Sequence, residues 1–206
     1  EVITLIEKQK FNELAEMVIR KRSTIRYLYR LLYSTDQLLR WRAIEAMGVV
    51  ADRLAEEDPE AVRNIIRSLL WSINDESGGI GWSAPECVGE IIHQRPEMFK
   101  EFASIIISFT GEQMLRRGVV WAAGRIAQAS PELVRKAVPE FIEFLDDPDP
   151  VVRGYTLRFL CITGEKPDFD RYRYLLDDQN TVPVYEKGAL KETTVANLAA
   201  CLVFNC

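Results

Sequence analysis

The sequence predicts an all-α fold, a right-handed α-solenoid (superhelix) of four to five antiparallel helix pairs. Apolar residues recur at spacings of three and four along the chain, as in amphipathic helices, and no convincing alternating strand pattern appears. Proline, glycine and aspartate interrupt these stretches where helices are expected to begin and end. A related segment returns at intervals of roughly 35 to 41 residues, which is the period of stacked helix pairs. These observations favour a single repeat domain over residues 1–206.

The recurring segment consists of an acidic residue, three further residues, an arginine and a helix rich in small residues. It reads DQLLRWRAIEAMG, EQMLRRGVVWAAG and DPVVRGYTLRFLC, beginning at Asp36, Glu112 and Asp149. An acid near a helix start is favoured by the helix dipole, and an arginine four residues later can pair with it. We therefore interpret the arginines of this segment as structural; they are Arg40, Arg116 and Arg153.

A second amphipathic helix precedes these segments, and it often begins with a proline, which suits the first turn of a helix. These prolines are Pro59, Pro96 and Pro131. The order is thus helix A, short turn, helix B, with residues 1–22 as an N-terminal capping helix, 23–163 as four repeats and 164–206 as an atypical C-terminal repeat. Terminal repeats commonly depart from the pattern, and we expect turns at 178–180 and 185–188.

The spacing of acid, arginine, alanines and glycine resembles HEAT-like repeats of the phycobiliprotein-lyase type. The resemblance covers residues 23–163, whereas 167–206 fit loosely, with Lys191 where the arginine is expected. The SGGIGW segment at 77–82 is also similar to a prokaryotic group of HEAT-repeat proteins. HEAT-like lyase subunits help to attach bilin chromophores to cysteines of antenna proteins. The resemblance therefore implies stacked helix pairs, while the repeat type itself is shared far beyond that activity.

The stretch NDESGGIGWSAPE at 74–86 departs from the repeat, since serine and glycine replace the acid and the arginine. Such local departures are expected at functional or strained sites. Ser83 to Glu86 can form a capping box, in which case the glycines only let the chain turn. Alternatively, the loop could hold an anion at a helix N-terminus, although it contains no Lys or Arg, or present Trp82 to a partner. The candidate ligand contacts of this loop are Ser77, Gly78, Gly79, Gly81 and Ser83.

Side chains of helix B that point away from the apolar stripe should line the concave face of the solenoid. Glu45, Glu86, Trp121 and Arg158 share one column of the repeat alignment and should form a row. An aromatic side chain flanked by charges is typical of an interaction hot spot, although Trp121 could also be half-buried filler. The candidate partner-binding residues are Trp82, Glu86, Glu90, Trp121, Arg125, Tyr155 and Arg158.

The sequence offers little support for catalysis or for a cofactor. Glu86, Glu90 and His93 have the spacing of metal ligands on one helix face, but His93 is the single histidine, so we expect no metal site. No nucleophile motif accompanies the four cysteines, and we assign no catalytic residue. A DNA-glycosylase-like use of Trp82 and Glu86 is opposed by the excess of acidic residues in 51–100, since phosphate neutralisation dominates DNA affinity.

The net charge of −5 gives no reason to expect a nucleic acid partner. No apolar run reaches membrane length, and the cysteines lack CxxC pairs, so we expect a cytoplasmic protein that does not use a membrane. The sequence thus predicts a non-enzymatic scaffold or adaptor that binds another protein on its concave helix-B face. The alternative is an enzyme or ligand-binding protein, such as a bilin-lyase-like subunit, that uses loop 77–81 with Trp82 and Glu86.

Overall fold

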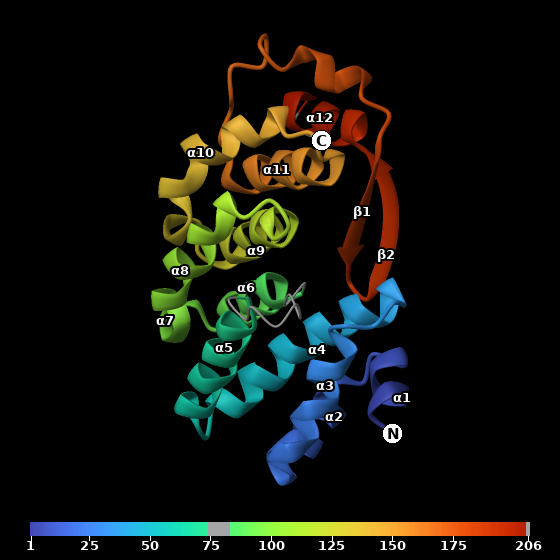
Figure 1. Cartoon of the computed structure of the whole chain (residues 1–206), viewed down its shortest axis with the longest axis vertical. Coiled ribbons are helices and arrows are strands. Elements are labelled where there is room, and N and C mark those ends of the chain that lie inside the picture. Colours follow the sequence, from blue (N-terminus) through green and yellow to red (C-terminus); the bar gives the residue numbers. More distant parts are fainter. Residues whose placement is uncertain (74–82, 205–206) are drawn as a thin grey trace.

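A computed structural model of the chain describes residues 1–73 and 83–204. It is mostly helical, with helices packed side by side and one small two-stranded hairpin (Figure 1). The predicted helical character is confirmed, and the expectation that the chain lacks strands is wrong. The candidate residues Trp82 and 77–81 lie outside the described residues. No helix in 1–73 or 83–204 combines the length and the apolar character that a bilayer crossing requires.

One row of helices runs the length of the molecule. Each member packs against the next one in the row, so the contacts are mainly between neighbours, as in repeat proteins (Figure 1). In order, the row consists of α2 (Phe11–Arg20), α4 (Gln37–Ala55), α6 (Ala84–Gln94), α9 (Arg116–Ala129), α11 (Pro150–Thr163) and α12 (Val195–Phe204). Four of these, α4, α6, α9 and α11, are the predicted B helices.

The remaining helical elements precede or connect the members of the row. They are α1 (Val2–Glu7), α3 (Ile25–Leu31), α5 (Pro59–Ile73), α7 (Pro96–Phe99), α8 (Ala103–Ile107) and α10 (Val138–Glu143), with 3-10 turns at 22–24, 100–102, 108–111, 131–133, 135–137, 144–146 and 173–177. The predicted helix starts at Pro59, Pro96 and Pro131 are confirmed, since α5, α7 and a 3-10 turn begin there. The helix expected after Pro131 is broken, because Pro139 lacks the N–H that a continuous helix would use.

Small residues let neighbouring members of the row approach closely. A Cβ added to Gly89 of α6 would lie 2.6 Å from Cα of Ala122 in α9. A Cβ added to Gly48 of α4 would lie 3.1 Å from Cβ of Glu90. Gly89 thus allows a side-by-side helix contact that a larger residue would prevent, and Gly48 allows a tight one, whereas Gly124 of the same alignment column has room for a Cβ.

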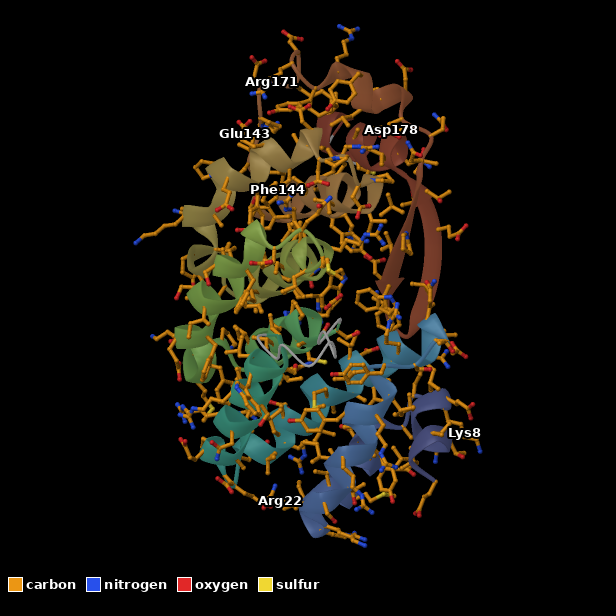
Figure 2. The ribbon with its side chains drawn as sticks, in the orientation of Figure 1. Lys8, Arg22, Glu143, Phe144, Arg171 and Asp178 are labelled. Carbon is orange, nitrogen blue, oxygen red and sulfur yellow. The ribbon has the colours of Figure 1, made fainter. Side chains whose placement is uncertain are left out.

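The arginines of the repeat connect consecutive units. Arg116 Nη1 lies 2.5 Å from Asp147 Oδ2, and Arg153 Nη2 lies 2.6 Å from Asp178 Oδ2. Asp178 lies near the C-terminal end of the row, where it is labelled in Figure 2. The acid four residues before the arginine has another task, since Asp149 accepts a hydrogen bond from Val151 N and caps α11. The structural interpretation of Arg116 and Arg153 agrees with these contacts. Arg40 is the exception, since among the described residues its hydrogen bond is to the Ser34 carbonyl oxygen of its own unit, at 3.4 Å.

The predicted atypical C-terminal repeat contains the hairpin. Strand β1 (Thr181–Glu186) pairs antiparallel with β2 (Ala189–Thr194), and Lys187 and Gly188 form the turn, as expected at 185–188. Both turn residues have positive φ, 49° and 76°, which suits a two-residue hairpin turn. The hairpin passes beside the row, from the α11 and α12 end to α4 (Figure 1).

Candidate functional site

The hairpin lies across the helix-B face that the sequence predicts to be concave. Two candidate partner-binding residues of α11 hold it: the Tyr155 hydroxyl donates to the carbonyl oxygen of Pro183 at 2.8 Å, and Arg158 pairs with Glu186 at 2.7 Å. Tyr155 is buried by these contacts. Part of the predicted binding face is therefore occupied by a segment of the same chain.

The tip of the hairpin is anchored on α4 by an aromatic cluster. The Tyr185 ring stacks on Trp41 with centroids 5.6 Å apart and an interplanar angle of 10°, and Trp41 in turn contacts Trp121 at 4.8 Å. The Tyr185 hydroxyl donates to Glu45, and Arg42 Nε donates to the carbonyl oxygen of Gly188 at 3.0 Å. Trp121, a candidate partner contact, is buried in this cluster, where it packs against Trp41 below the surface of this face.

Glu90 and Arg125 form a buried ion pair between α6 and α9. Arg125 Nε and Nη2 lie 2.6 and 3.0 Å from the two oxygens of Glu90, a geometry that matches a carboxylate. Burial raises the pKa of Glu90, and Arg125 opposes that rise. His93 Nδ1 lies 2.9 Å from the carbonyl oxygen of Arg125. Glu90 and His93 are thus engaged by Arg125, and 1–73 and 83–204 contain no cluster of three metal-ligating side chains.

Ser83 is the N-cap of α6, as predicted, but the predicted capping box does not form. The Ser83 hydroxyl donates to the carbonyl oxygen of Leu32 at 3.2 Å instead of capping the helix. The Glu86 side chain turns inward and is only 8% exposed. One of its oxygens rests against Gly118, where an added Cβ would lie 2.6 Å away. The glycine of α9 therefore provides the space that the Glu86 carboxyl group occupies.

Glu86 is an unusual buried acid. Among the described residues its Oε2 atom has no hydrogen-bond partner. Burial raises the pKa of Glu86 to about 7, although Arg40 of α4 opposes the shift. Glu86 is therefore partly protonated at neutral pH.

An open cleft of about 640 Å³ surrounds Glu86. The N-terminal ends of α4, α6, α9 and α11 border it, and Tyr33 and Met114 lie at its edge with 53% and 56% of their surfaces exposed. Arg117 pairs with Asp149 there. We call this the Glu86 cleft; its lining consists of Leu32, Tyr33, Arg40, Trp41, Ile44, Ser83, Glu86, Gln113, Met114, Arg117, Gly118 and Asp149.

Comparison with known proteins agrees with this arrangement. The sequence pattern of the HEAT-like repeat family matches residues 113–160, which include α9 and most of α11. An uncharacterized protein of Archaeoglobus fulgidus is 34% identical over 177 residues, which cover 83% of this chain and 91% of the relative. The chain belongs to the family of this archaeal protein. No solved structure matches the chain.

In this family member the structure brings together four candidate partner residues around one pocket between α9 and α11: Trp121, Arg125, Tyr155 and Arg158. Glu90 joins them through its pair with Arg125, whereas Glu86 lines the separate Glu86 cleft. Sequence reasoning missed Trp41, which links the hairpin to the cleft. The repeat alignment contained a signal for it, because Trp41 and Trp82 occupy the same column.

Proposed function

We propose that this protein is a non-enzymatic scaffold of the cytoplasm that binds a partner protein at the Glu86 cleft. For the fold, we propose a right-handed solenoid of HEAT-like helix pairs, of the phycobiliprotein-lyase type. The row of neighbour-to-neighbour helix contacts supports it.

The observation that carries the proposal is the composition of the cleft edge. Tyr33 and Met114 are large apolar side chains with more than half of their surfaces exposed, and charged side chains lie beside them. Exposed apolar side chains grouped around a concavity and surrounded by polar groups are typical of interaction sites. Methionine and tyrosine are also enriched in such sites.

The hairpin contacts support the same proposal. Tyr155 and Arg42 hold the hairpin through backbone carbonyl groups, so this face already binds a peptide segment by main-chain recognition. In the proposal Glu86 contributes to the partner site directly. The other predicted contacts support the site without touching the partner. Trp121 packs against Trp41, and Glu90 pairs with Arg125 within the row.

A photo-crosslinking amino acid at position 114 tests this proposal in cells. The matched control carries the same group at Ile105, an exposed apolar residue of α8 that does not line the cleft. We expect one partner protein to crosslink at 114, to be lost in a Tyr33→Ala background and to be absent at 105. Equal products at both positions, or none at 114, would contradict a partner site at the cleft.

A ligand-binding protein or enzyme is the second candidate, and the raised pKa of Glu86 favours it. A thermal-shift screen with tetrapyrroles, nucleotides, phosphate esters and divalent metals tests this candidate, because a specific ligand stabilises the folded state by mass action. If a bilin-lyase-like role holds, tetrapyrroles should raise the melting temperature and the other classes should not.

A further inference from the structure

We propose that the Glu86 cleft binds a small organic anion, a carboxylate with an apolar body, held by Arg40 and by a hydrogen bond from the Glu86 carboxyl group. This site goes beyond partner binding, because it is present in the isolated chain and needs no second protein.

The buried carboxyl group of Glu86 lacks a complete set of hydrogen-bond partners among the described residues. A buried polar side chain is nearly always paired, and a carboxyl oxygen without a partner costs desolvation free energy. Oε2 of Glu86 has no hydrogen-bond partner among the described residues, while the side chain lines an open cleft. Oε2 itself is buried against Gly118, so a ligand atom would supply the partner that the described residues do not once the carboxyl group rotates toward the cleft.

The charges around the cleft favour an anion. Arg40 and Arg117 contribute two positive charges, Asp149 contributes one negative charge, and Arg117 pairs with Asp149. Among the described residues, the one hydrogen bond of the Arg40 side chain is a long one, 3.4 Å to the Ser34 carbonyl oxygen, which leaves most of its guanidinium donors for a ligand. With Glu86 protonated the lining carries a net positive charge, which favours an anion over a cation.

The helices add to this preference. The N-terminal ends of α6 and α9, which no described side chain caps, border the cleft, and a helix N-terminus carries partial positive charge. Those of α4 and α11 are already capped by the carboxylates of Asp36 and Asp149. A carboxylate ligand would therefore meet Arg40, the helix ends and a protonated Glu86 as donor. Carboxylate and carboxylic acid make a short, charge-assisted hydrogen bond of this kind.

Part of the cleft lining is apolar. Leu32, Trp41 and Ile44 line the cleft, and Tyr33 lies at its edge. Small-molecule sites are mostly apolar with a few polar groups, and their volumes of about 300–1,000 Å³ include that of this cleft. Leu32, Trp41 and Ile44 are almost fully buried, so the apolar surface that an organic acid would cover belongs mainly to Tyr33 and Met114.

Binding of the anion should be coupled to protonation of Glu86. The charged and titratable groups facing Glu86 are Arg40 from α4, Arg117 from α9, and Asp149 and Tyr155 from the α11 side. Because the bound anion requires protonated Glu86, binding should take up a proton when the pH is above the pKa of Glu86. Affinity should then fall by about tenfold for each pH unit above about 7.

Titration calorimetry on the intact chain tests the site with three probes of matched size: benzoate, benzylammonium and benzyl alcohol. Each titration is repeated in buffers of different ionisation enthalpy, which reveals proton uptake. We expect benzoate to bind with proton uptake that approaches one proton above pH 7, and the other two probes to bind at least tenfold more weakly. Stronger binding of benzylammonium, or no binding of benzoate at millimolar concentration, would overturn the proposal.

Three variants assign the effect to the cleft. Glu86→Gln should still bind benzoate, because the amide also donates, but without proton uptake. Arg40→Gln should weaken benzoate binding by at least tenfold. Arg67→Gln, on the exposed side of α5, should change nothing. Benzoate binding that is unaffected by Arg40→Gln would place the anion elsewhere and refute the site. Failure of crosslinking at 114 leaves this result intact, so the two proposals fail separately.

Discussion

Replacing Glu86 with glutamine should make the protein more stable at alkaline pH. The free carboxyl group has a pKa of 4.5, and burial raises the pKa in the folded state to about 7. The folded state then binds more protons than the unfolded state between these values, so wild-type stability falls as pH rises from about 4.5 to about 7 and stays low above it. A shift of this size corresponds to ~3 kcal/mol of unfolding free energy. Glutamine resembles the protonated acid and carries no such penalty.

Urea unfolding of both proteins at about pH 5 and about pH 8 measures the difference. The stability of Glu86→Gln relative to wild type should increase by roughly 2–3 kcal/mol between the two conditions. The exposed Glu132→Gln variant corrects for the loss of a charge elsewhere. A wild-type to variant difference that stays constant with pH would show that Glu86 does not titrate as a buried acid. That result would refute the reasoning about the cleft.

Three further predictions concern the packing. Gly89→Ala should lower the unfolding free energy by ~1–3 kcal/mol, because an added Cβ would lie 2.6 Å from the backbone of α9. Gly124→Ala is the matched control, because the atom nearest to an added Cβ there is 3.8 Å away. This variant should unfold at the same urea concentration as wild type or at a higher one. Equal losses of stability in both variants would count against this explanation. Arg125→Ala should cost ~3–5 kcal/mol in urea unfolding, since it leaves Glu90 buried and unpaired; a loss below ~1 kcal/mol would mean that the pair is not essential. Tyr185→Ala should speed limited proteolysis within the hairpin by removing its aromatic anchor, and an unchanged cleavage rate would show that other contacts hold it.

The helix row was predictable because its signals are local and repeated. The spacing of apolar residues, the prolines at 59, 96 and 131, and the recurring acid and arginine are all visible in one dimension. The glycine column also had a physical meaning that the structure confirms. Gly48 and Gly89 lie at close approaches of neighbouring helices, where an added Cβ would meet Glu90 and Ala122, whereas Gly124 does not.

The hairpin was not predictable in the same way. Pro183 lies inside β1 and reads against a strand, because proline cannot donate to a neighbouring strand. Strand β2 is mostly exposed or half-buried, so it lacks the alternation that marks a strand. The positive φ values of Lys187 and Gly188 fit a hairpin turn, but Lys-Gly is a weaker signal than Asn-Gly.

The inward orientation of the Glu86 side chain depends on residues far away in the sequence. A serine followed three residues later by glutamate predicts a capping box, and local chemistry alone supports it. The Leu32 carbonyl group instead accepts the hydrogen bond of Ser83, and Gly118 leaves room for the carboxyl group to turn inward. Neither partner can be identified from the helix that carries Glu86. Tertiary contacts therefore decided the chemistry of the site.

The hairpin and the cleft form one packed unit through Trp41. This side chain lines the Glu86 cleft, stacks on Tyr185 of β1 and contacts Trp121 of α9. Deleting the hairpin to open the helix-B face would expose Trp41 and remove the hydrogen bond that Glu45 accepts from Tyr185. A truncated chain would then change the cleft itself, and altered binding could not be attributed to the uncovered face. Point variants such as Arg40→Gln, which leave this stack in place, are for that reason the sharper test of what the cleft binds.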